Sequence, residues 1–250
     1  MEKRVLKLVP KRNHKRIVHI ILFLFLILIL GLGIWYAREN YSIESIKVTG
    51  ADTYTDAEVI HAVQMEDYVP NTLVMILFNR VFGQNYLPFV DRMTMTYDHP
   101  HELKIKVKEK LRAGVFEYMG KYVYFNEKGM AMESRNHLFD GIPVITGLEY
   151  DKLVLGEKIP VGGDYFSTIV MITKKIAAYE LPVSEIHFDS EDEITLTCQD
   201  YSIYLGSRLN LEDKMARIPA VLKSLSKDHK KGTVDLSLYT DEKAIITYRQ

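Results

Sequence analysis

The first hydrophobic pattern along the chain is an unbroken one. Residues 17–36 read IVHIILFLFLILILGLGIWY, twenty residues with no formal charge apart from the titratable His19. At about 1.5 Å per residue, a helix of this length spans the roughly 30 Å hydrocarbon core of a bilayer. Trp35 and Tyr36 lie at its far end, and amphipathic rings of this kind favour the membrane interface. The pattern predicts a transmembrane helix over residues 17–36.

After this segment the chain changes to short alternating and helical patterns. Residues 44–49 alternate apolar and polar side chains, which is typical of a half-buried strand. Thr55-Asp-Ala-Glu58 has the form of a capping box and predicts the start of a helix. Residues 72–80 predict a second short helix. We expect three of its apolar side chains to dock on a sheet: Leu73, Ile76 and Leu77.

Residues 92–97 and 103–108 alternate on either side of the turn Asp98-His-Pro-His101, so they predict a β-hairpin with an apolar face and a lysine-rich face. Together with the preceding elements, this gives the order strand-helix-helix-strand-strand. That order is typical of an α+β fold.

Beyond Gly114 the sequence predicts short strands interrupted by two helices. Asp164 is expected to cap the first helix and Asn210 the second, in which Pro219 should introduce a kink or break a turn. The chain closes with two more alternating stretches, Val234–Leu238 and Ala244–Tyr248, which predict a C-terminal hairpin.

The distribution of charged residues predicts how the chain is oriented across the membrane. Residues 1–16 carry seven basic side chains and one acidic one, whereas 25 basic and 32 acidic side chains remain in the rest of the chain. By the positive-inside rule, residues 1–16 stay in the cytoplasm and residues 37–250 lie outside. A signal anchor explains the basic tail more simply than nucleic-acid binding does. The single cysteine forbids an internal disulfide, so the outer region depends on packing alone.

That cysteine is the strongest candidate for catalysis. Thr195-Leu-Thr-Cys198 resembles the Thr-Leu-x-Thr-Cys signature of sortases, and His137 and Arg208 are candidate partners for a thiolate. The motif is one residue short, however. A period of two also places the thiol on the same face as Ile194 and Leu196. The sequence therefore favours a buried packing residue over a nucleophile.

Other patterns of catalytic or metal-binding residues are weaker. His99 and His101 flank a turn proline and have no identifiable third ligand. The acidic run at residues 191–193 is more typical of a solvated turn than of an acid/base pair. The sequence contains no P-loop, dinucleotide fingerprint or HExxH motif. We therefore predict no catalytic residues, no metal site and no cofactor.

Several segments resemble the bacterial division proteins FtsQ and DivIB. The element order of residues 41–110 is similar to that of the family's POTRA module. The most informative later segment, Ile142-Pro-Val-Ile-Thr-Gly-Leu148, follows the family pattern Leu-Pro-x-Ile-Thr-Gly-Leu. The other segments that carry the resemblance are Ile46-Lys-Val48-Thr-Gly50, Leu87-Pro-Phe-Val90, Pro100 with Leu103-x-Ile-x-Val-x-Glu109, and Tyr122–Gly129, in which Asn126 replaces a more usual aspartate.

The resemblance implies an architecture and a function. It implies a cytoplasmic tail (1–16), a transmembrane signal anchor (17–36), a POTRA domain (41–110) and a β domain with two helices (111–250). It also implies a noncatalytic scaffold at the division septum that binds FtsB/DivIC-like and FtsL-like partners and thereby regulates the septal cell-wall synthase pair. The alternative is a membrane-anchored, sortase-like cysteine transpeptidase that uses Cys198.

In this family the partner adds as a strand to the C-terminal edge of the β domain. The family's apolar-Asp-Leu-Arg segment falls on Val234-Asp-Leu-Ser237, where serine replaces arginine. We expect deletion of residues 233–250 to abolish partner recruitment. The partner-binding residues that the resemblance implies are Leu238, Tyr239, Ala244, Ile246, Tyr248 and Arg249.

Overall fold

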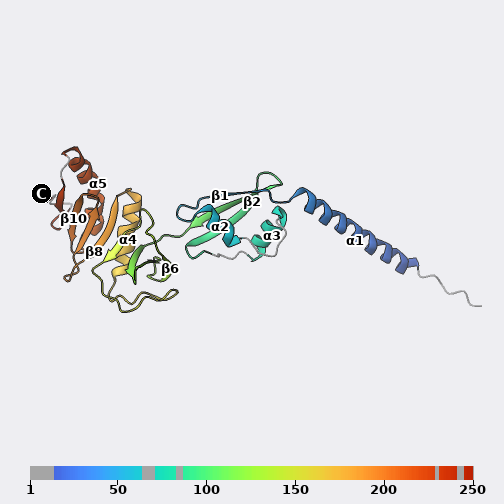
Figure 1. Cartoon of the computed structure of the whole chain (residues 1–250), viewed down its shortest axis with the longest axis horizontal. Coiled ribbons are helices and arrows are strands. Elements are labelled where there is room, and N and C mark those ends of the chain that lie inside the picture. The colour runs from blue at the N-terminus through green and yellow to red at the C-terminus, as the bar shows by residue number, and fades with distance from the viewer. Residues whose placement is uncertain (1–13, 64–70, 83–86, 229–230, 241–244, 250) are drawn as a thin grey trace, which may run out of the picture. The chain divides into compact units, whose positions relative to one another are not determined.

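The computed structural model describes residues 14–63, 71–82, 87–228, 231–240 and 245–249 (Figure 1). Within these residues the chain forms five helices and twelve strands, so the predicted α+β class is confirmed. The chain divides into two compact units. The first is built from Met1–Gln84 and Met93–Val107, and the second from Asn85–Arg92 and Lys108–Gln250.

The predicted transmembrane segment lies inside helix α1 (His14–Asn40). The apolar side chains of residues 17–36 are all exposed, as expected of a surface that faces lipid. Among the described residues, α1 is the one helix that is long and apolar enough to cross a membrane.

The rest of the first unit has the predicted order of elements. Its elements are β1 (Ser45–Thr49), α2 (Asp56–Val63), α3 (Thr72–Phe82), β2 (Val90–Tyr97) and β3 (Glu102–Glu109), of which the last two strands reach into the second unit. They form a small sheet in the order β1-β3-β2, with β1 parallel to β3. Alternation places Leu103, Ile105 and Val107 of β3 in the core.

The two short helices of this unit differ in how well the sequence predicted them. The capping box before α2 is confirmed, because Thr55 N donates to Glu58 Oε2 at 2.9 Å and Glu58 N donates to Thr55 Oγ1 at 3.3 Å. The expectation that α3 docks through Leu77 is wrong. Leu77 is 62% exposed, Leu73 and Ile76 are half-buried, and Thr72 and Met75 face the core instead.

The second unit is built on a large sheet that contains nine of the described strands, in the order β12-β11-β10-β9-β8-β7-β4-β5-β6. Its strands are β4 (Gly114–Tyr118), β5 (Lys121–Phe125), β6 (Ala131–Arg135), β7 (Val144–Thr146), β8 (Val183–Phe188), β9 (Ile194–Cys198), β10 (Tyr201–Gly206), β11 (Gly232–Asp235) and β12 (Thr247–Arg249). Strands β9 and β10 form an antiparallel hairpin, and the predicted pairing of the last two strands is confirmed as antiparallel.

Two helices make the crossovers that parallel strands require. Helix α4 (Tyr165–Ala178) connects β7 to β8, and α5 (Leu211–Asp228) connects β10 to β11. Both helices join the strands in one continuous core. Its helical members are Phe166, Ile169, Ile172 and Ile176 of α4, and Leu211, Met215 and Ile218 of α5.

The N-terminal ends of these helices correct two expectations. Asp164 occupies the N-cap position of α4, but its side chain makes no capping hydrogen bond. Its carbonyl oxygen instead accepts a hydrogen bond from the Ser167 hydroxyl. Asn210 precedes α5 with a φ of 52°, whereas an N-cap residue usually has an extended backbone. Pro219 lies inside α5 and does not end it.

Candidate functional site

The C-terminal strand β12 is the outermost strand at one edge of the large sheet. It pairs antiparallel with β11 through Thr233↔Arg249, Val234↔Tyr248 and Asp235↔Thr247. Among the described residues no further strand pairs with the outer side of β12. A strand in this position presents backbone donors and acceptors along its free side.

The close approach of Gly232 to Arg249 shows which backbone groups of β12 face away from β11. A Cβ atom on Gly232 would lie 2.1 Å from the carbonyl oxygen of Arg249, so this oxygen points toward β11. Backbone groups of successive residues in an antiparallel strand point alternately to either side. The N–H and C=O of Tyr248 therefore point away from β11 and lie on the free edge.

A cavity of about 280 Å³ lies where α5 approaches the last two strands. It is largely apolar, and it is lined by Arg217, Ala220, Val221, Ser224, Leu225, Val234, Ile246 and Tyr248. The Tyr248 hydroxyl donates to the carbonyl oxygen of Lys231 at 2.7 Å, which fixes one end of this side chain. An incoming strand at β12 would have an apolar recess directly beside it.

The predicted partner-binding residues are distributed around this edge. Ile246 and Tyr248 line the cavity, and Arg249 is exposed on β12. Leu238 is 66% exposed in the loop before β12, whereas Tyr239 packs against the core. Ala244 lies outside the described residues.

The segment Val234-Asp-Leu-Ser237 has a structural role at the end of β11. Asp235 Oδ1 accepts hydrogen bonds from the backbone N–H of Ser237 at 2.8 Å and from its hydroxyl at 2.6 Å, which turns the chain out of the strand. Val234 and Leu236 are fully buried. Deletion of residues 233–250 would therefore remove part of the core as well as the edge.

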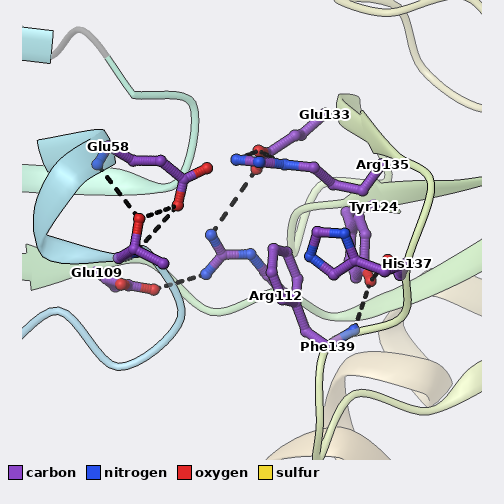
Figure 2. A network of polar contacts seen from close by, with 9 residues as sticks. Glu58, Glu109, Arg112, Tyr124, Glu133, Arg135, His137 and Phe139 are labelled. Carbon is purple, nitrogen blue, oxygen red and sulfur yellow. Dashed lines mark hydrogen bonds and ion pairs between the residues drawn. The ribbon is translucent and has the colours of Figure 1, made fainter. Parts of the chain in front are cut away.

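The opposite edge of the large sheet holds a buried ionic cluster that the sequence analysis missed (Figure 2). Arg112 Nη1 donates to Glu109 Oε2 at 2.6 Å, and Nη2 lies 3.8 Å from Glu133 Oε2 on β6. All three side chains are at most 9% exposed. The guanidinium also lies 4.5 Å from the centre of the Phe89 ring, a distance typical of a cation–π contact.

The same cluster continues through aromatic side chains to the segment after β6. Phe139 N donates to the Tyr124 hydroxyl at 2.8 Å, and this hydroxyl donates to the carbonyl oxygen of His137 (Figure 2). Burial raises the pKa of Tyr124 above its usual 10.0. Glu133 is also paired with Arg135. Glu109 is close to Arg112 in sequence, but Glu133 and Phe89 are distant from it, so the local pattern gave no signal for the assembled cluster.

Comparison with known proteins relates the second unit to a protein family. Residues 116–237, which cover most of the second unit, match the family model for the C-terminal region of the cell-division protein FtsQ/DivIB. Residues 116–237 therefore form an FtsQ/DivIB C-terminal domain. This domain together with α1 indicates a single-pass membrane protein with an extracytoplasmic domain and a role in cell division.

A solved structure is also similar. It is the major extracytoplasmic domain of the trans isomer of the bacterial cell division protein DivIB from Geobacillus stearothermophilus. It is 21% identical over 49% of this chain and 99% of that chain, with a TM-score of 0.30. No curated protein sequence matches the chain.

The FtsQ/DivIB segment at Ile142–Leu148 has a packing explanation. Gly147 has a φ of 79°, and a Cβ atom there would lie 1.7 Å from the carbonyl oxygen of Phe188, so only glycine fits. Thr146 Oγ1 donates to Glu185 Oε1 at 2.6 Å on the neighbouring strand β8. Both residues fix β7 against β8, and neither lies at the β12 edge.

The structure gives no support to the sortase alternative. Cys198 is fully buried, and burial raises its pKa from 9.0 to about 12, whereas a nucleophilic thiol needs a lowered pKa. The Arg208 guanidinium lies over the Tyr165 ring, and the His137 ring packs edge-on against Phe139. The expectation that Cys198 packs on the core face with Leu196 is confirmed.

One histidine of the hairpin turn has a structural contact. His101 Nδ1 lies 2.9 Å from the carbonyl oxygen of Ser42, in the segment between α1 and β1. Across the described ranges no group of three or more His, Cys, Asp or Glu side chains lies close enough together to hold a metal ion.

Proposed function

We propose that this chain is a noncatalytic scaffold of the division complex and that a partner joins it by adding a strand to β12. The observation that carries the proposal is the free edge of β12 beside an apolar cavity, at the C-terminal end of an FtsQ/DivIB domain. In this proposal residues 41–110 form a POTRA domain and residues 111–250 form the partner-binding β domain.

The chemistry of the edge defines the partner. Backbone hydrogen bonds to Tyr248 supply affinity, and an apolar side chain of the added strand fills the cavity next to Ile246. Leu238 supplies a further exposed apolar contact, Tyr239 supports it from the core, and Arg249 supplies a polar contact. Ala244, which lies outside the described residues, stays a predicted contact. The partners are an FtsB/DivIC-like protein and an FtsL-like protein, which connect the scaffold at the septum to the cell-wall synthase pair.

The backbone N–H of Tyr248 provides a sharp test. Tyr248→Pro removes this donor together with the side chain, whereas Tyr248→Ala removes the side chain alone. Proline is tolerated on an edge strand when its nitrogen faces away from the sheet, so the fold should survive. Leaving a backbone partner unsatisfied costs about 1–3 kcal/mol, so Tyr248→Pro should bind roughly tenfold more weakly than Tyr248→Ala.

The measurement is the affinity of the full chain in nanodiscs for the purified extracytoplasmic segment of a DivIC-like protein from the same organism. Near-ultraviolet circular dichroism of each variant checks that the second unit is folded. Equal affinities for the proline and alanine variants would contradict strand addition at β12. If both variants bound the partner as well as the unsubstituted chain, the proposed binding site at Tyr248 would be wrong.

A further inference from the structure

Helix α3 has an unusual distribution of polar and apolar side chains. Its buried side includes Thr72, although a surface helix normally buries apolar residues and exposes polar ones. On the opposite side Leu77 and Val81 are each 62% exposed. With Leu73 one turn earlier, these residues form a stripe at i, i+4 and i+8, which we call the α3 stripe. The exposed face of the helix is therefore apolar.

The start of α3 is hydrogen-bonded to the end of the membrane anchor. The side-chain amide of Asn71 donates to the carbonyl oxygen of Ala37 at 2.9 Å, and the backbone N–H of Thr72 donates to that of Tyr41 at 2.8 Å. Asn71 Oδ1 also accepts from the backbone N–H groups of residues 73 and 74, which caps α3. One buried asparagine thus joins the first turn of α3 to the last turn of α1.

This connection places the α3 stripe close to the bilayer. Ala37 directly follows Trp35 and Tyr36, the residues expected at the membrane interface. At 1.5 Å per residue, Leu77 lies only about 7.5 Å along the helix from Thr72. The interfacial layer on each side of the hydrocarbon core is roughly 5–8 Å deep. The exposed leucine is therefore within reach of this layer.

We propose that α3 is an interfacial helix and that the α3 stripe inserts into the outer leaflet of the membrane that α1 crosses. An amphipathic helix in this position buries its apolar face about 5–10 Å into the boundary between headgroups and acyl chains. Arg80, the one charged residue of α3, is exposed beside the stripe and can bind lipid phosphate. A lipid surface is favoured over a protein partner because the anchor delivers α3 to the bilayer in every copy of the chain.

The burial of the single cysteine allows the proposal to be tested by site-specific thiol labelling. Because the Cys198 thiol is fully buried, Leu77→Cys or Val81→Cys introduces a single accessible thiol for a bimane fluorophore. The labelled full chain is reconstituted into phosphatidylcholine vesicles with and without bromine on the acyl chains. Ala57→Cys, an exposed position on helix α2 of the same unit, is the matched control.

The expected result is a blue-shifted emission at positions 77 and 81 that is lost in brominated vesicles, with neither effect at position 57. Adding Leu77→Glu to the Val81→Cys chain should restore emission, because a carboxylate in the interface opposes insertion. Labels at 77 and 81 that behave like the label at 57 would overturn the proposal. So would shielding that develops only when a purified division protein is added, since a protein would then cover the stripe. The inference does not depend on β12, and Tyr248→Pro should leave these signals unchanged.

Discussion

The two edges of the large sheet differ in whether another segment of the chain hydrogen-bonds to the outermost strand. At the β6 edge, a loop hydrogen-bonds to the first residue of the strand: Ala131 N donates to the carbonyl oxygen of Glu157 at 2.9 Å, and Gly156 N donates to that of Ala131 at 2.7 Å. At the β12 edge, the described residues supply no comparable cover on the outer side. One edge of the sheet is thus covered at the start of its strand by a loop of the same chain, and the other has no such cover among the described residues.

The side chains at the two edges also differ: charged groups are buried at the β6 edge, and an apolar cavity lies at the β12 edge. Glu133 on β6 is held between Arg112 and Arg135, and buried or inward-facing charge protects an edge from pairing with another chain. Beside β12 the chain places an apolar cavity and no described ionic cluster. An open edge costs solubility and risks aggregation, so its presence at one end only supports a use for it there.

Substitution of Arg112 should have the largest effect on stability, and it should distinguish the stabilising role of the β6 edge from the binding role proposed for the β12 edge. Arg112→Met leaves the Glu109 and Glu133 carboxylates buried without their cation, which typically costs about 3–5 kcal/mol. The thermal midpoint of the second unit, followed by near-ultraviolet circular dichroism of the full chain in micelles, should fall sharply. Below that midpoint the protein should still bind the DivIC-like segment, because β12 lies at the other end of the sheet.

Arg135→Met is the matched control for Arg112→Met. It removes a cation from the same Glu133, but the Arg135 side chain is 24% exposed and solvent screens its charge. The loss of stability should therefore be clearly smaller. Equal losses in both variants would show that burial of Arg112 does not determine the strength of the cluster.

Gly232→Ala should act on the open edge with an intermediate effect. The new Cβ atom would lie 2.1 Å from the carbonyl oxygen of Arg249, and the φ of 156° is unfavourable for alanine. Strain of this kind costs about 1–3 kcal/mol, and the chain can relieve it by releasing β12 from β11. We expect faster amide exchange in residues 247–249 and weaker binding of the DivIC-like segment.

Gly120→Ala is the matched control for the glycine substitution. Gly120 has a φ of 73°, but a Cβ atom there would meet no atom within 4 Å. It therefore carries a backbone penalty without the clash at β12. Normal binding by Gly120→Ala and weak binding by Gly232→Ala would attribute the effect to the β11–β12 contact; weak binding by both would attribute it to general destabilisation.

The sequence predicted whatever depends on local periodicity. Alternation placed Leu103, Ile105 and Val107 in the core, and the Thr55–Glu58 spacing predicted a capping box, because both signals arise within a few residues. It did not predict the Arg112 cluster, since the guanidinium meets Glu133 and the Phe89 ring only after the strands have assembled. The open edge was expected from family resemblance and not from the residues themselves.

Helix α3 shows a different limit of sequence reasoning. Its apolar residues predict docking on a sheet, because the apolar side of a short helix is usually buried against protein. The structure places Leu77 outward and Thr72 inward. Periodicity identifies an apolar face but does not state whether protein or lipid covers it, and the bond from Asn71 to the anchor supplies that missing information.

Substitution of Cys198 should have the smallest effect and should affect neither edge. Cys198→Ala removes one buried sulfur in the middle of the sheet, with an expected loss of about 1 kcal/mol and normal binding of the DivIC-like segment. In the unsubstituted chain the folded thiol, with its pKa raised to about 12, should not react with iodoacetamide at pH 8. Above the unfolded pKa near 9, the unfolded thiol loses its proton first, so the contribution of Cys198 to stability should fall as the pH rises toward 12. Cys198→Ala should abolish this alkaline component in unfolding titrations, and rapid thiol modification of the folded chain at pH 8 would instead restore the case for a reactive cysteine.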